Sequence, residues 1–149
     1  MTDPKISVSK IKNEEDLKTA QEIRYEVFVI GQNVPAEEEI DEFEDVCNHF
    51  LAYYNNTPCG AARWRITPNG VKLERFAVLE QFRKKGIGSA LVKSVLEDIS
   101  INPENKTRKL YLHSQISAMP LYQKFGFISE GDRFQECDID HFKMTKFAE

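Results

Sequence analysis

A basic turn that contains glycine is the most chemically specific segment of this sequence. It runs from Gln81 to Ser89 as QFRKKGIGS, directly after a β-prone run and directly before an apolar helical pattern. Glycine adopts positive φ without a Cβ clash, so the backbone there can wrap closely around a ligand. Free N–H groups at a helix start attract anions, and Arg83, Lys84 and Lys85 add charge-assisted contacts. The turn predicts a phosphate site, and a basic loop before an ordinary helix is the alternative.

The spacing of the glycines separates this turn from two common nucleotide-binding loops. The Walker A pattern is absent, and the dinucleotide fingerprint lacks its third glycine and the later acidic residue. Arg83, Gly86 and Gly88 form R-x-x-G-x-G, which resembles the acyl-CoA turn of the GNAT N-acetyltransferase superfamily. The resemblance implies that the CoA pyrophosphate is held by Arg83, Lys84, Lys85, Gly86, Ile87, Gly88 and Ser89.

A second segment lies downstream in the order that the same family shows. Ala118 to Phe127 reads AMPLYQKFGF and is similar to the family pattern A-x-x-[LF]-Y-x-K-x-G-F. Other runs resemble the ElaA/YjcF-like branch of the family, namely residues 24–41, 62–65, 72–75 and 139–144. Together the resemblance covers almost the whole chain. It implies a short helix that presents Tyr122 to the CoA sulfur.

The resemblance implies an acetyltransferase that moves an acetyl group from acetyl-CoA to a primary amine on a small molecule or peptide. Transfer is expected to be direct, in a ternary complex, because neither Cys59 nor Cys137 has an evident base beside it. No metal is expected. A non-catalytic module of the same fold that binds or senses acyl-CoA is the alternative, and a protein-interaction domain is a third. The oligomeric state, a homodimer included, is left open.

Three side chains are candidates for proton transfer in this reaction. Tyr122 is the expected general acid for the departing thiolate, because a phenol stays protonated at pH 7. Glu74 is the first candidate for the general base, and an ion pair with Arg63 or Arg65 on a neighbouring strand is its structural alternative. His113 is the second candidate, because imidazole titrates near neutral pH. Each also has a packing or hydrogen-bonding alternative.

Backbone groups on the strand before the turn are expected to contact the cofactor. The backbone of Phe76, Ala77 and Val78 should pair with the pantetheine arm like an added strand, and the N–H of Val78 should polarise the thioester carbonyl. The apolar alternation of this strand breaks near Arg75. Such a break is typical of a β-bulge, and bulges are common beside active sites.

Charge is unevenly distributed along the chain. Residues 1–74 hold 8 Lys and Arg against 14 Asp and Glu, whereas residues 75–149 hold 12 against 10. The acidic run from Glu37 to Asp45 has two interpretations: a solvated helix face, or carboxylates such as Glu37, Glu38 and Glu39 that attract a cationic acceptor. His49 and His141 are weaker candidates for the base and are assigned to the walls of the acceptor cleft.

The elements that position these residues follow from hydrophobic periodicity. Strands are expected over 5–11, 49–55, 59–67, 71–79, 109–114, from 128, and over 142–147. Helices are expected from 14, capped by Asn13 and ended by Gly31, from Pro35, over 86–99, and from a Ser117 cap to Gly126. The fold class is therefore α+β. It is one GNAT-like domain over residues 1–149, with a mixed, mostly antiparallel sheet of six to seven strands flanked by about four helices.

Composition excludes several other classes. The chain has 149 residues, 41% hydrophobic and 30% charged, with ten Phe and five Tyr, which is too apolar for a disordered segment. No apolar run reaches the roughly 20 residues that a membrane helix needs. A dominant basic face, typical of nucleic-acid binders, is missing. Three scattered cysteines are typical of free thiols in a reducing compartment, so we expect a soluble cytoplasmic protein.

Overall fold

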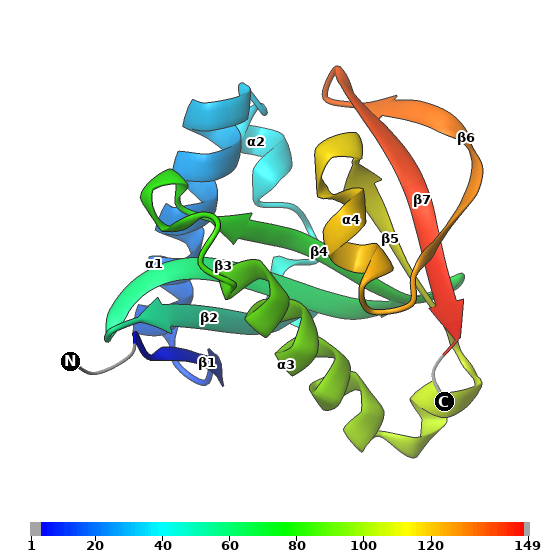
Figure 1. Cartoon of the computed structure of the whole chain (residues 1–149), viewed down its shortest axis with the longest axis horizontal. Coiled ribbons are helices and arrows are strands. Elements are labelled where there is room, and N and C mark those ends of the chain that lie inside the picture. The colour runs from blue at the N-terminus through cyan, green and yellow to red at the C-terminus, as the bar shows by residue number, and fades with distance from the viewer. Residues whose placement is uncertain (1–3, 148–149) are drawn as a thin grey trace.

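Seven strands form one mixed sheet in the order β1-β2-β3-β4-β5-β7-β6 in a computed structural model, which describes residues 4–147 (Figure 1). The strands are β1 (Ile6–Lys10), β2 (Asn48–Tyr54), β3 (Thr57–Thr67), β4 (Gly70–Val78), β5 (Lys109–Gln115), β6 (Ile128–Glu136) and β7 (Ile139–Phe147). The helices are α1 (Glu14–Arg24), α2 (Ala36–Glu39), α3 (Ile87–Ile101) and α4 (Met119–Gln123). The expected α+β class and element order are confirmed.

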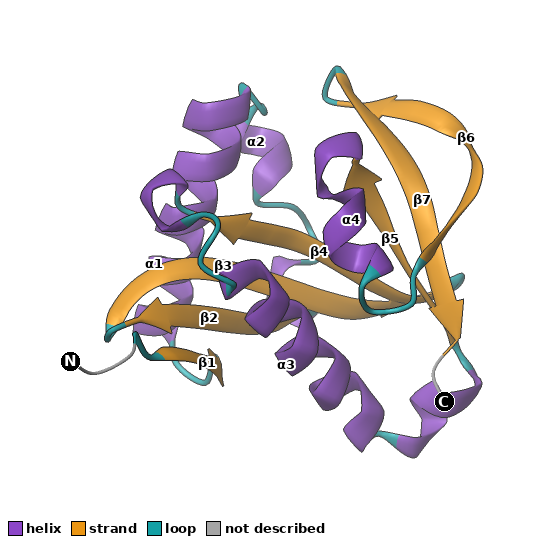
Figure 2. Cartoon of the chain, in the orientation of Figure 1, coloured by secondary structure: helices purple, strands orange, loops and turns teal. Residues whose placement is uncertain are grey.

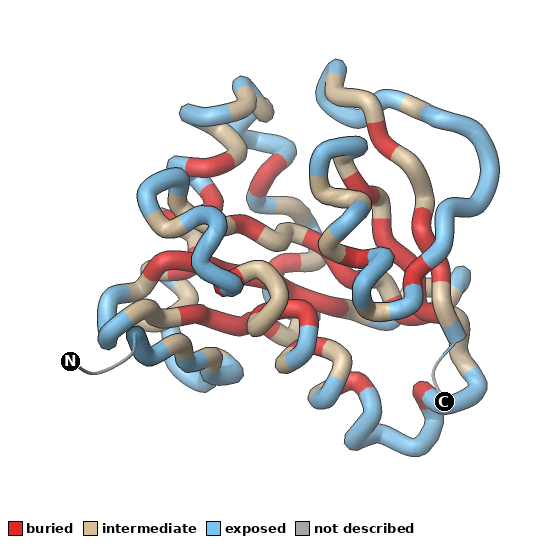
Figure 3. The backbone as a smooth tube through the Cα atoms, in the orientation of Figure 1, coloured by how far each residue is buried: buried red, intermediate tan, exposed pale blue. Residues whose placement is uncertain are grey.

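Helices cover both faces of the sheet (Figure 2). The larger hydrophobic core lies under α3 and α4, where Leu91, Val92 and Val95 pack against strand residues such as Leu73 and Leu112. A smaller apolar cluster lies under α1 on the opposite face. Strand β6 differs from the others because almost all of it is exposed (Figure 3). The cluster under α1 contains residues of β2, β3 and β4 but, among residues 4–147, none of β5, β6 or β7, so the part of the α1 face formed by these last strands is available for polar side chains.

The sheet divides where β4 meets β5. Among the described strands this is the one parallel pair, and it consists only of Val71 opposite Leu110 and Lys72 opposite Tyr111. Beyond these residues the two strands point apart (Figure 1). The facing edges of β4 and β5 are left without a strand partner, so a gap opens in the middle of the sheet.

Local sequence signals explain most helix boundaries, with two exceptions. The Asn13 side chain accepts a hydrogen bond from the Asp16 N–H at 2.8 Å, which confirms the expected cap of α1. The same helix continues as a π-helix over Tyr25–Ile30, which the regular spacing of its apolar residues did not indicate. The cap predicted at Ser117 is wrong, because Ser117 lies within a 3-10 turn and α4 begins after Ala118 without a side-chain cap.

The cysteines and the apolar segments can be compared with what the sequence predicts. Cys47, Cys59 and Cys137 are all free thiols. Within residues 4–147 no helix combines the length and the apolar character that crossing a bilayer requires.

Candidate active site

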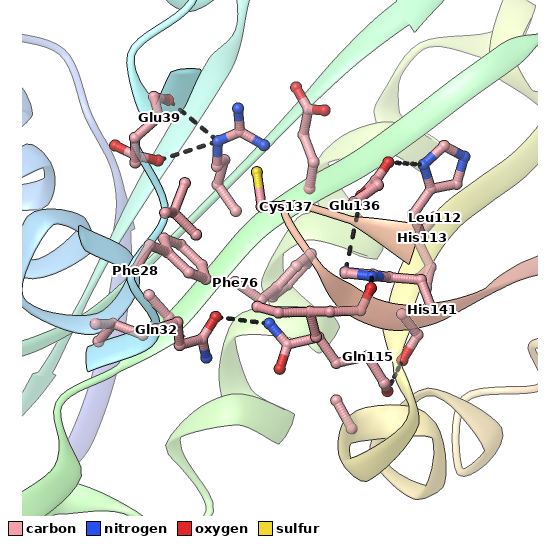
Figure 4. A pocket seen from close by; sticks show the side chains of 18 of the residues that line it. Phe28, Gln32, Glu39, Phe76, Leu112, His113, Gln115, Glu136, Cys137 and His141 are labelled. Carbon is pink, nitrogen blue, oxygen red and sulfur yellow. Dashed lines mark hydrogen bonds and ion pairs between the residues drawn. The ribbon is translucent and has the colours of Figure 1, made fainter. Parts of the chain in front are cut away.

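A cleft of about 720 Å³ opens on the α1 side where β4 and β5 separate (Figure 4). The π-helical segment contributes Phe28, and Gln32 follows it, to form one wall. The ends of β5, β6 and β7 form the other wall. Among the predicted site residues, the cleft brings together Glu74, Phe76, Ala77, Val78, Arg83, His113 and Tyr122. The rest of the glycine turn lies outside this lining.

The expected bulge in β4 is present. Ala61 lies opposite Ala77 and Arg63 lies opposite Glu74, so β4 contains one extra residue between these pairs. Arg75 accommodates it with a φ of 59°, in the left-handed region. The bulge bends the strand at the cleft and redirects the side chains on either side of it.

Backbone alternation in β4 shows which amides face the gap. The Leu79 N–H donates to the Cys59 carbonyl at 2.9 Å, so Leu79 faces β3. Ala77, two residues earlier, faces β3 as well, and Val78 must face the gap. The Arg83 Nε donates to the Val78 carbonyl at 3.1 Å. Val78 therefore offers its N–H to the cleft, whereas the backbone of Ala77 is already paired.

Tyr122 lies at the floor of the same gap. It is 6% exposed, and its ring packs edge-on against Phe76 at a centroid distance of 5.7 Å and against Phe127 at 6.2 Å. Burial raises the pKa of its hydroxyl above the ordinary value. The phenol is therefore protonated at neutral pH, and it is held next to the edge of β4.

The glycine turn leads directly into α3. Gly86 is the N-cap with a φ of 88°, and no side chain caps the helix. The Ala90 N–H is bonded to the Gly86 carbonyl, so the N–H groups before it have no partner within the helix. Arg83, Lys84 and Lys85 are exposed around these free donors. The turn thus provides an uncapped, positively charged helix start.

Glu74 belongs to a buried ionic cluster. Its carboxylate lies 2.6 Å from the Arg63 guanidinium, 3.0 Å from Arg65 Nε and 3.4 Å from Lys72 Nζ. Burial alone would raise the pKa of Glu74, but the cations Arg63, Lys72, Arg75 and Arg65 outweigh burial and lower it. A carboxylate held by three cations is a poor proton acceptor, so the geometry favours the ion-paired alternative for Glu74.

The acidic run divides between this cluster and a solvated face, because Glu37, Glu42 and Asp45 are exposed whereas Glu39 and Glu44 are buried. Glu39 is 3% exposed and Glu44 is 5% exposed, and both pair with the buried guanidinium of Arg24 at 2.9 and 2.7 Å. Asp41 pairs with Arg63 at 2.7 Å. The interpretation of Glu39 as a free, substrate-attracting carboxylate is therefore wrong. Glu38 is exposed and lines the cleft.

The histidines separate into two environments. His49 is a buried residue of β2, with Nε2 2.8 Å from the Glu44 carbonyl, and it does not line the cleft. His113 Nδ1 lies 2.7 Å from Glu136, and His141 Nε2 lies 3.7 Å from the same carboxylate. In Figure 4 the carboxylate of Glu136 lies between the two rings. Across residues 4–147, no three His, Cys, Asp or Glu are arranged to hold a metal ion.

Two contacts that the sequence did not indicate connect the opposite walls of the cleft. Gln115 Nε2 donates to Gln32 Oε1 at 2.7 Å, and these side chains extend toward each other in Figure 4. The Cys137 thiol donates to Glu38 at 3.0 Å. Both pairs join residues more than 80 positions apart in the chain, so no local pattern could have revealed them.

Comparisons with known proteins agree with this geometry. The family model described as "Acetyltransferase (GNAT) domain" matches residues 13–148. YjcF of Bacillus subtilis (strain 168), described as an uncharacterized N-acetyltransferase, is 41% identical over 137 residues, which are 91% of this chain and 95% of YjcF. The crystal structure of Escherichia coli ElaA has a TM-score of 0.83 at 25% identity, covering 95% of this chain and 99% of ElaA.

A second similar structure is a GNAT family acetyltransferase from Elizabethkingia anophelis with acetyl-CoA bound. Its TM-score is 0.68 at 22% identity, and the match covers 94% of this chain and 96% of that one. The splayed sheet, the glycine turn and the extent of the family match lead to one conclusion: this chain belongs to the GNAT acetyltransferase family.

Proposed function

We propose that this enzyme transfers an acetyl group from acetyl-CoA to a primary amine, directly and in a ternary complex. The observation that carries the proposal is the gap between β4 and β5. It places the free Val78 N–H and the protonated Tyr122 hydroxyl at one cleft, with the uncapped start of α3 nearby. A related structure of this fold was solved with acetyl-CoA bound, which supports the same cosubstrate here.

The two ends of the cofactor have separate binding groups. The pyrophosphate fits the turn, where α3 N–H groups and the charges of Arg83, Lys84 and Lys85 are available. The pantetheine arm fits the gap edge of β4 as an added strand. Only alternate residues of β4 can take part, because the backbone of Ala77 already faces β3.

The reaction breaks the thioester C–S bond and forms an amide C–N bond. The Val78 N–H stabilises the developing negative charge on the carbonyl oxygen. The Tyr122 hydroxyl donates its proton to the thiolate sulfur, which leaves as free CoA thiol. The amine must lose a proton to a base, and the electron pair it frees forms the new bond.

His141 is the base that the geometry supports best. Glu74 is engaged by three cations, and His113 directs Nδ1 toward Glu136. In His141, Nδ1 lies 2.7 Å from the Ile139 carbonyl. A carbonyl only accepts, so Nδ1 carries the hydrogen and the neutral ring keeps its lone pair on Nε2. His141 is 7% exposed and lines the cleft.

The test is a screen of primary amines with acetyl-CoA, in which release of free CoA thiol is measured. We expect turnover with at least one amine. Tyr122→Phe should lower kcat roughly 10²-fold, at the low end for general acid catalysis, while acetyl-CoA affinity stays nearly unchanged. Tyr25→Phe is the matched control, because Tyr25 is 49% exposed and lies outside the cleft lining.

Two results would contradict the proposal. Tight acetyl-CoA binding without thiol release for any amine would support the non-catalytic sensor instead. An unchanged kcat in Tyr122→Phe would reduce Tyr122 to a packing role against Phe76 and Phe127.

A further inference from the structure

Two imidazoles and one carboxylate converge on the α1 face of the sheet, where β5 and β6 end and β7 begins. His141 in β7 lies opposite Gln115 of β5 on one side and opposite Phe134 of β6 on the other. Residues directly opposite each other in neighbouring strands point to the same face of the sheet, so these three side chains share one face. His113 precedes Gln115 by two residues and shares that face. Glu136 follows Phe134 by two residues and does the same. The hairpin of β6 and β7 thus brings Glu136 between His113 and His141 (Figure 4).

The hydrogen bonds around this group leave two acceptors facing each other. His141 donates through Nδ1 to the Ile139 carbonyl, so its Nε2 presents a lone pair. That nitrogen lies 3.7 Å from Glu136 Oε1. A lone pair and a carboxylate oxygen at this distance have no hydrogen between them when the ring is neutral. A donor with at least two N–H groups would satisfy both.

Building on the proposed transfer reaction, we propose that the acceptor enters as an aliphatic ammonium and binds between Glu136 and His141. One N–H of the ammonium donates to Glu136 Oε1 and another donates to His141 Nε2. This arrangement assigns the substrate class: a primary amine that is protonated at neutral pH. Glu136 binds the charge, and His141 removes the proton.

The charge of Glu136 is available for a ligand, unlike that of three other carboxylates that line the cleft. Glu39, Asp41 and Glu74 each pair with arginine. Among residues 4–147, the basic side chains within 4 Å of the Glu136 carboxylate are the two histidines, which are cations only when protonated. Lys72 also acts on it electrostatically, but the Lys72 ammonium pairs with Glu74 at 3.4 Å.

Glu136 is ionised at neutral pH. Partial burial would raise the pKa of Glu136, but the hydrogen bond from His113 lowers it below the ordinary value, as do the charge of Lys72 and that of each histidine when it is protonated. At neutral pH the Glu136 carboxylate is therefore negatively charged while an aliphatic amine is positively charged, so the two attract each other.

His113 is a positioning residue in this arrangement. Its Nδ1 lies 2.7 Å from Glu136 Oε2 and holds the carboxylate from the side away from His141. Phe134 packs against both rings, edge-on to His113 at 5.0 Å and stacked on His141 at 5.9 Å. Glu136 is 44% exposed and lies at the end of the exposed strand β6, so these contacts fix where it points.

The proton balance of the step is complete. The ammonium gives one proton to His141 Nε2, and the resulting neutral amine attacks the thioester carbonyl with the freed electron pair. His141 becomes an imidazolium that faces the Glu136 carboxylate across 3.7 Å, so the new charge is formed beside an opposite one. As the amide forms, the nitrogen loses its second proton, which replaces the one that the Tyr122 hydroxyl gives to the thiolate sulfur. The proton on His141 passes to solvent after the product leaves.

The experiment compares two acceptors in the wild type and in Glu136→Gln. One acceptor is an aliphatic amine, charged at pH 7, and the other is an aromatic amine, which is uncharged at that pH. Loss of a charge-assisted hydrogen bond at this half-exposed site should raise KM for the aliphatic amine about tenfold. KM for acetyl-CoA and for the aromatic amine should stay unchanged.

Glu130→Gln is the matched control. Glu130 lies on the same strand and pairs with Lys109 and Lys143, outside the cleft lining. His113→Phe should change KM in the same direction as Glu136→Gln. His113→Gln, which keeps an N–H donor, should restore part of the loss.

Calorimetric titration of the aliphatic amine into the CoA complex makes the same comparison without turnover. An equal loss for both acceptors, or unchanged KM and binding in Glu136→Gln, would overturn the inference and leave Glu136 as a hairpin contact. If the wild type binds the amine through Glu136 but releases no thiol, the proposed transfer fails and the binding site stands.

Discussion

Replacing Glu74 by Gln separates a structural role from a catalytic one. The carboxylate is 7% exposed and contacts Arg63, Arg65 and Lys72 within 3.4 Å, and the Arg63 side chain is fully buried. Removing one partner of a buried ion pair costs about 3–5 kcal/mol. Glutamine keeps the shape and can still accept hydrogen bonds, so we expect the lower end, about 3 kcal/mol. For a domain of this size that corresponds to a fall in Tm of about 6–12 °C.

The measurement combines urea unfolding with turnover well below Tm. We expect the stability loss together with turnover within a few-fold of the wild type. Glu97→Gln is the control, because Glu97 is exposed on α3 and its carboxylate has no ion pair among the described residues. Unchanged stability together with a loss of turnover of roughly 10²-fold or more would refute this reasoning and make Glu74 the general base.

The pH dependence of stability provides a second check on Glu74. Its folded-state pKa is lowered from 4.5, so its contribution is present above that pH and is lost as pH falls through the folded value. The difference in unfolding free energy between wild type and Glu74→Gln should therefore shrink below about pH 4.5. A difference that stays constant down to pH 3 would contradict the lowered pKa.

Three further predictions remain, two for the turn and one for the hairpin. Gly86→Ala should weaken acetyl-CoA binding, because an alanine at a φ of 88° strains the backbone of the turn by about 1–2 kcal/mol. The added Cβ itself would meet only Ile6, at 3.9 Å, so the effect comes from the backbone and not from a clash. Lys84→Gln with Lys85→Gln should weaken binding and flatten its salt dependence, and calorimetry at two salt concentrations checks both. The pKa of Cys137 is raised to about 11, chiefly by the hydrogen bond to Glu38. Iodoacetamide should therefore modify it slowly at pH 8 and several-fold faster in Glu38→Gln, as peptide mass spectrometry would show; equal rates would exclude that effect of Glu38.

The sequence predicted the elements and the glycine turn that begins α3, because both depend on local patterns. Alternation and helical spacing located all seven strands, and the break near Arg75 located the bulge that the structure contains. The π-helical segment escaped prediction because its one-residue register change hardly alters the spacing of apolar side chains. The Ser117 cap failed because the chain adds a 3-10 turn before α4.

The acceptor side of the site could not be predicted, because its residues meet only through tertiary pairing. Glu136 lies 23 residues after His113 and depends on the order β5-β7-β6 to reach it. Neither interpretation of the acidic run included ion pairing of Glu39 and Glu44, because nothing nearby in the sequence shows that Arg24 and Arg63 are buried opposite them. Long-range charge pairing therefore decided which carboxylates are structural and which remain free.

The gap between β4 and β5 also limits which molecules can pair with the free edges of these two strands. Two strand edges with unpaired backbone groups normally invite another protein chain to add a strand. Here those edges lie inside the molecule, with the π-helical segment and Phe28 on one side and Tyr122 on the other. A thin, flexible ligand can reach the free amides, whereas a polypeptide would need room for side chains on both faces. The fold thus exposes hydrogen-bonding edges to a small linear molecule while it protects them from aggregation.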